Sequence, residues 1–514
     1  METVSPSSVS EKKRSVGSSG ALSRKISARD AAAALAVACA CGACVLGFTP
    51  WRVVVPALLA ASAVPFVYRS LAAPATAAKV STPAATFDHS PPVPVRKLRQ
   101  MLWALAVLIA CTEILVIRKP DAFLKPQFWQ EDVFLFQDAR QEGLPSIFEM
   151  LDRPQIRRGQ TVMFQRIIAY FGKAVPPREA PLYYSAAAMV VTLAAAAYIM
   201  FARIGGLGMV TRAFLALALM ITFNTEQIYL TVVNLQWILT LVLLLILMER
   251  EPETRAGRAL LFLATGILCL TGPFVTFLWT LFLVRALVRR TPCSVALFGI
   301  SLACAVWQIF RIQIVPTQGK VHLTDPYWQV AFGQSYVGQL FLGSLLDDLS
   351  IHRVVYVGLS LAVFLGLAAY AWRRRDAEVA VLLAASLLFL GSAALTYRVS
   401  PEALTRPGHR YFFVPYTCLT WAFIIAAGRL WGSGWCIPCV AAVAAIVVAS
   451  IPHLTMRPLA DLRWEECSRY IDGPRACLIY TNPFPQFFIY CEAKPSPTNS
   501  PALMLPDPLP PRWR

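Results

Sequence analysis

The residues with the clearest potential for chemistry are two adjacent carboxylates, Glu131 and Asp132, in the aromatic segment Phe128-Trp129-Gln-Glu-Asp-Val-Phe134. A carboxylate that is partly removed from water has a raised pKa and can take a proton from a hydroxyl group. It can also bind a metal ion. Alternatively, the pair can cap a helix expected over 133–151, since acidic residues stabilise a helix N-terminus by roughly 0.3–1 kcal/mol. The spacing leaves these three roles open.

Later segments carry residue types that bind sugars or phosphates, and each has a structural alternative. Arg166 lies in a second amphipathic stretch, 160–174, and can bind phosphate oxygens or extend from an apolar surface to water. Asn234 and Gln236 suit sugar hydroxyls, with Trp237 as a stacking surface. The same two amides can instead join helices by hydrogen bonds.

A phosphate site is predicted at His409, Arg410 and Tyr411, which open an apolar helix. A helix N-terminus favours anions, and the two basic side chains add to that preference. Anchoring at the membrane interface is the alternative role for these residues.

The composition indicates that these residues belong to a membrane protein. Hydrophobic residues make up 57% of the 514 residues and charged residues 15%, whereas globular proteins average about 45–50% and about 25%. A soluble chain of this composition would expose large apolar patches. The excess of 47 basic over 29 acidic residues is then a topological signal and not a nucleic-acid signal.

Apolar runs of about 20 residues predict an all-α, polytopic fold with about 13 transmembrane helices, since no strand-like alternation appears. Thr271-Gly272-Pro273 divides two short runs, which could also form one kinked element with a re-entrant piece. The predicted spans are 31–49, 52–70, 99–117, 182–202, 213–231, 234–248, 259–271, 273–288, 294–311, 354–372, 377–396, 411–428 and 435–452.

Basic loops predict the orientation. With 13 spans, the short arginine-bearing loops all fall on one side, which the positive-inside rule assigns to the cytoplasm. The N-terminus is then cytoplasmic and the C-terminus extracytoplasmic. The expected organisation is a basic tail (1–30), a transmembrane hairpin (31–70), a linker (71–98), a transmembrane domain (99–452) with outer loops 118–181 and 312–353, and an extracytoplasmic segment (453–514).

Three of the 13 cysteines, Cys467, Cys477 and Cys491, fall in that last segment. One pair among them can form a disulfide in an oxidising compartment. The spacing does not select the pair.

Several short motifs follow one another in an order that resembles a group of bacterial multi-pass proteins, which in turn look like the GT-C glycosyltransferase superfamily. The resemblance covers roughly residues 99–490. It rests on Trp129-x-Glu131-Asp132-x-Phe134, Gly159-Gln-Thr-Val-Met-Phe-Gln-Arg166, Asn234-Leu-Gln236-Trp237, Thr271-Gly272-Pro273-Phe274 and Gly408-His409-Arg410-Tyr411-Phe412.

The resemblance implies a GT-C-like fold with interfacial helices in the first outer loop and hexosyl or pentosyl transfer from a polyprenyl-phosphate sugar. The acceptor would be an envelope glycan or lipid on the extracytoplasmic face of a bacterial inner membrane. Asp132 would be the catalytic base, supported by Glu131. Arg410, His409 and Arg166 would hold the donor phosphate, and Trp129, Asn234, Gln236, Trp237 and Tyr411 would bind substrate.

The chain departs from the usual GT-C pattern in two ways. Its acidic loop follows the third predicted span rather than the first, and that loop lacks an Asp-x-Asp triplet. No metal-ligand cluster or cofactor motif appears. The missing triplet puts metal dependence in doubt, and a divalent cation stays an open possibility. The alternatives to an enzyme are a transporter or flippase of lipid-linked glycans and a non-catalytic membrane assembly protein.

Overall fold

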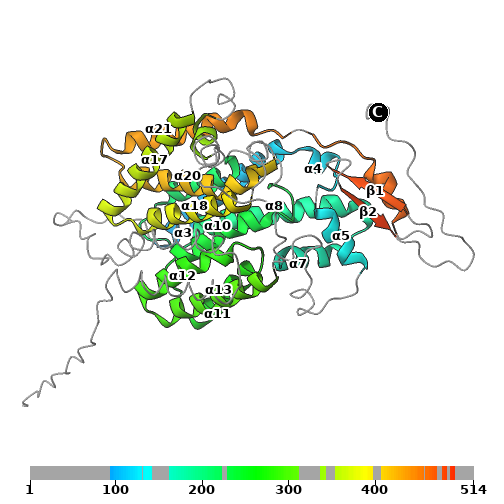
Figure 1. Cartoon of the computed structure of the whole chain (residues 1–514), viewed down its shortest axis with the longest axis horizontal. Helices are drawn as coiled ribbons and strands as arrows, with labels where there is room; N and C mark the ends of the chain where they lie inside the picture. The colour runs from blue at the N-terminus through cyan, green and yellow to red at the C-terminus, as the bar shows by residue number, and fades with distance from the viewer. Residues whose placement is uncertain are drawn as a thin grey trace, which may run out of the picture.

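The computed structural model describes residues 93–129, 131–141, 161–222, 228–311, 336–342, 353–396, 407–456, 458–471, 477–482 and 487–491. This part of the chain is mostly helical, as predicted, and its long helices run roughly along the long axis of an elongated molecule (Figure 1). The predicted spans 31–49 and 52–70 lie outside the described residues, as does most of the loop 312–353.

Helices occupy each predicted span from residue 99 onward. They are α3 (Val93–Arg118), α8 (Ala180–Phe201), α9 (Met209–Ile221), α10 (Leu235–Met248), α11 (Arg255–Cys269), α12 (Val275–Arg289), α13 (Pro292–Arg311), α17 (Arg353–Arg374), α18 (Ala377–Thr396), α20 (Phe413–Arg429) and α21 (Cys436–Ser450). Shorter elements are α4 (Asp121–Leu124), α5 (Asp132–Gln141), α7 (Met163–Gly172), η2 (Pro177–Glu179), α15 (Gln339–Leu342), η4 (Pro407–Phe412), η5 (Ile451–His453), α22 (Trp464–Cys467) and η6 (Ser468–Tyr470).

Five helical segments in the described chain are long and apolar enough to cross a membrane. They are Gln100–Arg118, Pro177–Phe201, Pro292–Arg311, Arg410–Arg429 and Cys436–His453. Peripheral helices expose large apolar side chains, such as Leu105 on α3, Leu263 on α11 and Leu365 on α17. Such exposed side chains suit a lipid environment, and the chain is therefore a membrane protein.

Helix α20 forms the centre of the bundle. Every residue from Phe413 to Ala427 is buried, and the helix packs against α9, α10, α18 and α21. Gly428 allows a close approach to α9, because a Cβ there would lie 2.6 Å from Oγ1 of Thr211. An all-round apolar helix is buried in this way because it has no polar face to present to water.

The helical backbone is interrupted at two places, between α9 and α10 and between α11 and α12. The predicted span 213–231 is wrong at its end, because α9 stops at Ile221 and Leu230 has a left-handed φ of 58°. The predicted division at Thr271-Gly272-Pro273 is confirmed, since α11 ends at Cys269 and α12 begins at Val275. Both interruptions leave backbone groups unpaired within the apolar bundle, and side chains must bind them.

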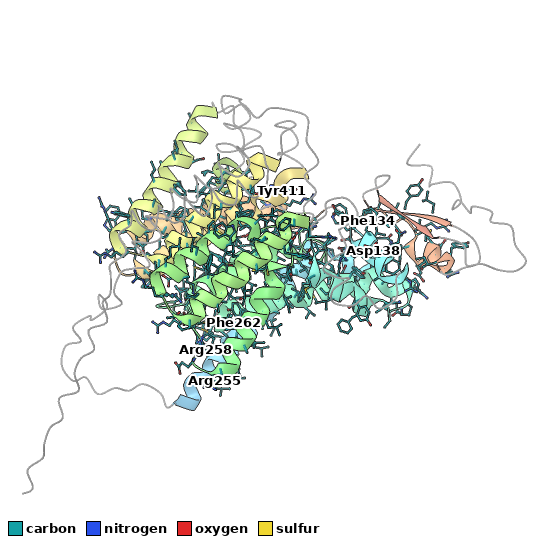
Figure 2. The ribbon with its side chains drawn as sticks, turned by 60° about the horizontal axis from the view of Figure 1, so that its bottom comes forward. Phe134, Asp138, Arg255, Arg258, Phe262 and Tyr411 are labelled. Atoms are coloured by element: carbon teal, nitrogen blue, oxygen red, sulfur yellow. The ribbon has the colours of Figure 1, made fainter. Side chains whose placement is uncertain are left out.

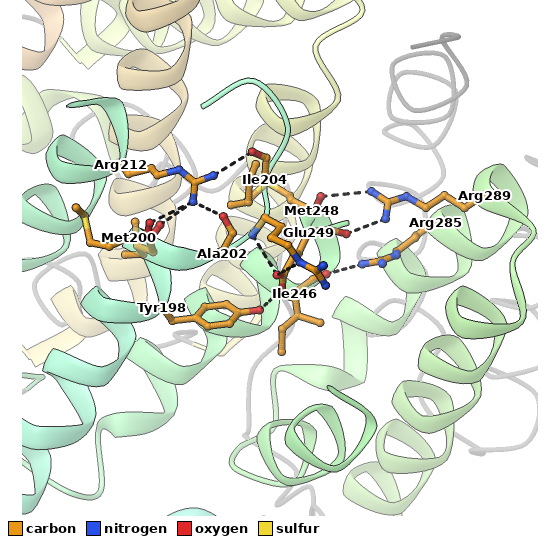
Figure 3. A network of polar contacts seen from close by, with 12 residues as sticks. Tyr198, Met200, Ala202, Ile204, Arg212, Ile246, Met248, Glu249, Arg285 and Arg289 are labelled. Atoms are coloured by element: carbon orange, nitrogen blue, oxygen red, sulfur yellow. Dashed lines mark hydrogen bonds and ion pairs between the residues drawn. The ribbon is translucent and has the colours of Figure 1, made fainter. Parts of the chain in front are cut away.

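Arginines cap helix ends at one end of the bundle, which we call the arginine end. Arg212 donates to the carbonyls of Ile199, Ala202 and Ile204 after α8 (Figure 3). Arg285 and Arg289 donate to the last carbonyls of α10. Helix C-termini leave four carbonyls without intrahelical partners, so these basic residues stabilise the helix ends as well as marking the loops.

The loop end lies opposite and carries α4, α5, α7 and the hairpin of β1 (Cys477–Thr481) and β2 (Phe487–Cys491) (Figure 1). Figure 2 places Phe134 and Asp138 of α5 beside this hairpin, far from Arg255 and Arg258 of α11. The predicted amphipathic stretch 160–174 is largely the helix α7. In the stretch 133–151 the described helix is α5, and residues 142–151 lie outside the described residues.

Candidate functional site

Asp132 is the first residue of α5 and is 3% exposed. Its Oδ2 accepts the backbone N–H of Val232 at 3.0 Å, and its Oδ1 accepts the N–H of Val233 at 2.6 Å. The carboxylate therefore bonds the segment before α10. The sequence had suggested that it could instead cap its own helix. Burial with strong partners is typical both of structural anchors and of catalytic carboxylates.

The pKa of Asp132 lies far above its ordinary value. Burial raises the pKa to about 7, against the opposing effect of the two backbone hydrogen bonds and of the nearby Lys119 charge. Glu131 raises it further through like-charge repulsion. A carboxyl group with this pKa exchanges its proton near neutral pH, which is the range in which a general base is most effective.

Lys119 is a site residue that sequence reasoning missed. It follows the last residue of α3, is 2% exposed, and holds its Nζ 5.5 Å from the centroid of the Trp129 ring. Burial lowers its pKa, while the charges of Asp121 and Asp132 raise it. A lysine at the outer end of a predicted span breaks the positive-inside pattern, and that signal could have found it, as it did for Arg410.

A small cavity of about 100 Å³ lies beside Lys119 and Trp129. Its other lining residues are Met456, Pro458, Leu459, Ala460 and Asn482. Among the described residues the Trp129 indole N–H and Oε2 of Glu131 are buried without hydrogen-bond partners. The region therefore offers the Lys119 cation, whose charge acts on Asp132, and two polar groups that have no partners within the described ranges.

The C-terminal hairpin supports the Trp129 segment. Asn482 forms a parallel bridge with Trp129 and donates its backbone N–H to the Phe128 carbonyl at 3.3 Å. The Asn482 side chain bonds both backbone groups of Ala460, at 2.9 and 3.1 Å. The Phe128 ring packs edge-on against Trp464, with 4.8 Å between centroids. Distant parts of the chain thus fix the position of this tryptophan.

Gln165 of α7 joins both helix interruptions and was also missed. Its Nε2 donates to the carbonyls of Val233 at 3.3 Å and Thr271 at 3.2 Å. Gln308 extends the network with bonds to the carbonyls of Thr161 at 3.0 Å and Gly272 at 3.1 Å. These amides bind backbone groups that the broken helices leave open, so the loop α5–α7 is tied to the bundle.

The predicted substrate residues of α10 have mainly structural surroundings. Asn234 is buried, and its Nδ2 lies 3.2 Å from Oγ1 of Thr231. Oε1 of Gln236 is buried without a partner in the described chain and lies against Gly272. Both therefore lie at the helix interruptions rather than on an open surface.

Trp237 does not offer the open stacking surface that the sequence predicted. It is 3% exposed and packs against Phe274 and Tyr411, with centroid separations of 4.4 and 5.2 Å. The guanidinium of Arg410 lies 5.6 Å from the Tyr411 ring centroid. The contact with Trp237 places Tyr411, the residue after Arg410, next to the start of α10.

The predicted site residues thus form two groups linked by residues 232–237. Asp132 bonds Val232 and Val233, and Trp237, four residues after Val233, contacts Tyr411. Arg166 stands next to Gln165 on α7 and is partly exposed. The side chain of His409 is outside the described part of the structure. Within the described residues, no three His, Cys, Asp or Glu side chains are placed to hold a metal ion.

No protein-family model, no curated protein and no solved structure matches this chain.

Proposed function

We propose that the protein is an integral-membrane glycosyltransferase with a GT-C-like arrangement. It moves a sugar from a polyprenyl-phosphate donor to an envelope glycan or lipid on the extracytoplasmic face. The observation that carries the proposal is the buried Asp132 carboxylate, whose pKa of about 7 suits proton removal from an acceptor hydroxyl. Its place just beyond a membrane-spanning helix suits a donor whose phosphate lies at the lipid surface.

In this mechanism Asp132 takes the acceptor proton as the hydroxyl oxygen attacks the sugar, with inversion at the anomeric carbon. The bond to the donor phosphate breaks, and the leaving phosphate gains negative charge. Lys119 supports a phosphate role because its buried ammonium lines the cavity beside Trp129. Arg410, His409 and Arg166 remain the phosphate ligands implied by the sequence resemblance.

The proposal includes the full topology of about 13 spans in a bacterial inner membrane, with a cytoplasmic N-terminus. The placement of basic loops supports this orientation. Arg250 donates its backbone N–H to the Arg203 carbonyl, and Arg429 contacts Asp376, which follows Arg373–Arg375. Four basic loops thus gather at the arginine end, as the positive-inside rule requires of cytoplasmic loops.

One observation favours a second candidate, a non-catalytic assembly protein. Both oxygens of Asp132 bond backbone N–H groups, which is what a purely structural carboxylate would do. A flippase is favoured less, because the two helix interruptions lie at the loop end and not midway along the bundle.

The test uses purified protein in nanodiscs with a panel of polyprenyl-phosphate sugars, and it follows release of polyprenyl phosphate. Wild type is compared with Asp132→Asn and with Asp461→Asn, a control whose carboxylate is exposed. Release that is lost only in Asp132→Asn supports the enzyme. Donor binding without turnover in all three proteins points to a flippase or to a missing acceptor. Absence of donor binding rejects the proposed donor.

A further inference from the structure

Two of the three C-terminal cysteines occupy one register position of the hairpin. In the antiparallel ladder Cys477 pairs with Cys491, at the start of β1 and the end of β2. Residues directly opposite in such a ladder have Cα atoms about 4.5 or about 5.5 Å apart, depending on the pair type. Both separations fall in the range of about 4.4–6.8 Å that disulfides require.

The third cysteine lies elsewhere. Cys467 belongs to the short helix α22, and its Sγ donates to the Leu462 carbonyl at 3.8 Å. The backbone register therefore selects one of the three pairings that the sequence left open.

We infer that Cys477 and Cys491 form a disulfide that closes the open end of the hairpin. The inference rests on the proposed orientation, which places residues 453–514 in an oxidising compartment. Two thiols lose two protons and two electrons to a disulfide-bearing thiol oxidase of that compartment. The oxidase disulfide is reduced to a dithiol as the new S–S bond forms.

The bond would reinforce the support of the candidate site. Its ring encloses Asn482, which bridges Trp129 and bonds the Phe128 carbonyl. A closed ring restricts the unfolded hairpin, so the folded hairpin is favoured. We expect reduction to increase hydrogen exchange at residues 477–491 and at the Phe128–Trp129 segment.

The test uses the full chain, purified without reductant after free thiols are blocked by alkylation. Proteolysis and mass spectrometry should find Cys477 and Cys491 unalkylated and lighter together by two hydrogens. Reduction should make both alkylatable. Cys477→Ser and Cys491→Ser should each free the remaining thiol, while Cys467→Ser should leave the pair intact.

Full alkylation of Cys477 and Cys491 before reduction would overturn the inference. Adding diamide to the reduced protein then separates two causes. Rapid pairing under diamide would mean that the register is right and the compartment is reducing. Failure to pair would mean that the register itself is wrong. Neither readout depends on glycosyl transfer, so the proposed reaction stands or falls separately.

Discussion

The replacement Asp132→Asn tests the raised pKa directly. It keeps the shape of the side chain and removes its titration. The variant keeps one carbonyl oxygen for a backbone N–H, but its amide N–H₂ would face the other. The variant therefore loses one of the bonds to Val232 and Val233 and no longer carries a buried charge at high pH.

The size of the effect follows from the pKa. A rise from 3.8 to about 7 corresponds to about 4 kcal/mol of preference for the protonated carboxyl in the folded protein. The folded state then binds a proton that the unfolded state has released, so stability falls as pH rises between about 4 and about 7. From pH 5 to pH 7 the wild type should lose about 2 kcal/mol through this group, and Asp132→Asn should not.

Unfolding free energies in detergent micelles at several pH values provide the assay. The difference between wild type and Asp132→Asn should change steadily up to about pH 7 and be constant above it. The control Asp461→Asn removes a carboxylate that is 55% exposed, and its difference from wild type should change far less. Parallel curves for wild type and Asp132→Asn would refute the raised pKa.

The same group predicts the pH dependence of transfer. If Asp132 is the base, the rate should fall about tenfold for each pH unit below about 7 and level off above it. Asp132→Asn should lose about 10²–10⁴-fold in rate while donor binding persists. A variant that folds and retains full transfer would reject the catalytic role and leave the anchoring role.

Three further substitutions test the surroundings of the site and the bundle. Lys119→Met removes a charge that lowers the pKa of Asp132, so the midpoint of the rate profile should move to higher pH; an unchanged midpoint would contradict this. Gly272→Ala places a Cβ 3.1 Å from the Cβ of Gln236 and displaces its amide oxygen, so chemical unfolding should show a loss of about 1 kcal/mol. Arg212→Ala leaves carbonyls after α8 without donors, so its melting temperature should fall, and a wild-type value would exclude the capping role.

Much of the fold could be predicted from the sequence, because apolar runs in lipid have few alternatives to helices. The break at Thr271-Gly272-Pro273 was predictable for the same local reason, since glycine and proline interrupt helices. The end of α9 was missed, although the polar run Asn224-Thr-Glu-Gln227 interrupts the apolar residues just after it. Not predictable were the turn at Leu230 beyond that run and the binding of the following backbone by Asp132. That bond joins residues 100 positions apart.

Residue type identified Asp132, but spacing could not identify its partners. Its environment depends on Lys119, which follows α3, and on the segment before α10. Burial of Trp237 could likewise not be predicted. Its type suits sugar stacking, yet Phe274 and Tyr411 cover it, and burial of this kind is decided by tertiary packing. Residue type thus indicates candidate groups, whereas their burial and partners depend on the tertiary structure.

Anchoring and catalysis are compatible at Asp132. A carboxylate has about four lone-pair positions, and the backbone N–H groups of Val232 and Val233 occupy one on each oxygen. The remaining positions can accept a substrate proton, and the two bonds hold the group in one orientation. Those bonds also favour the ionised form, yet burial outweighs them and the pKa stays near 7. A base that must take and release a proton at neutral pH needs a pKa in this range, and the proposed role of Asp132 depends on it.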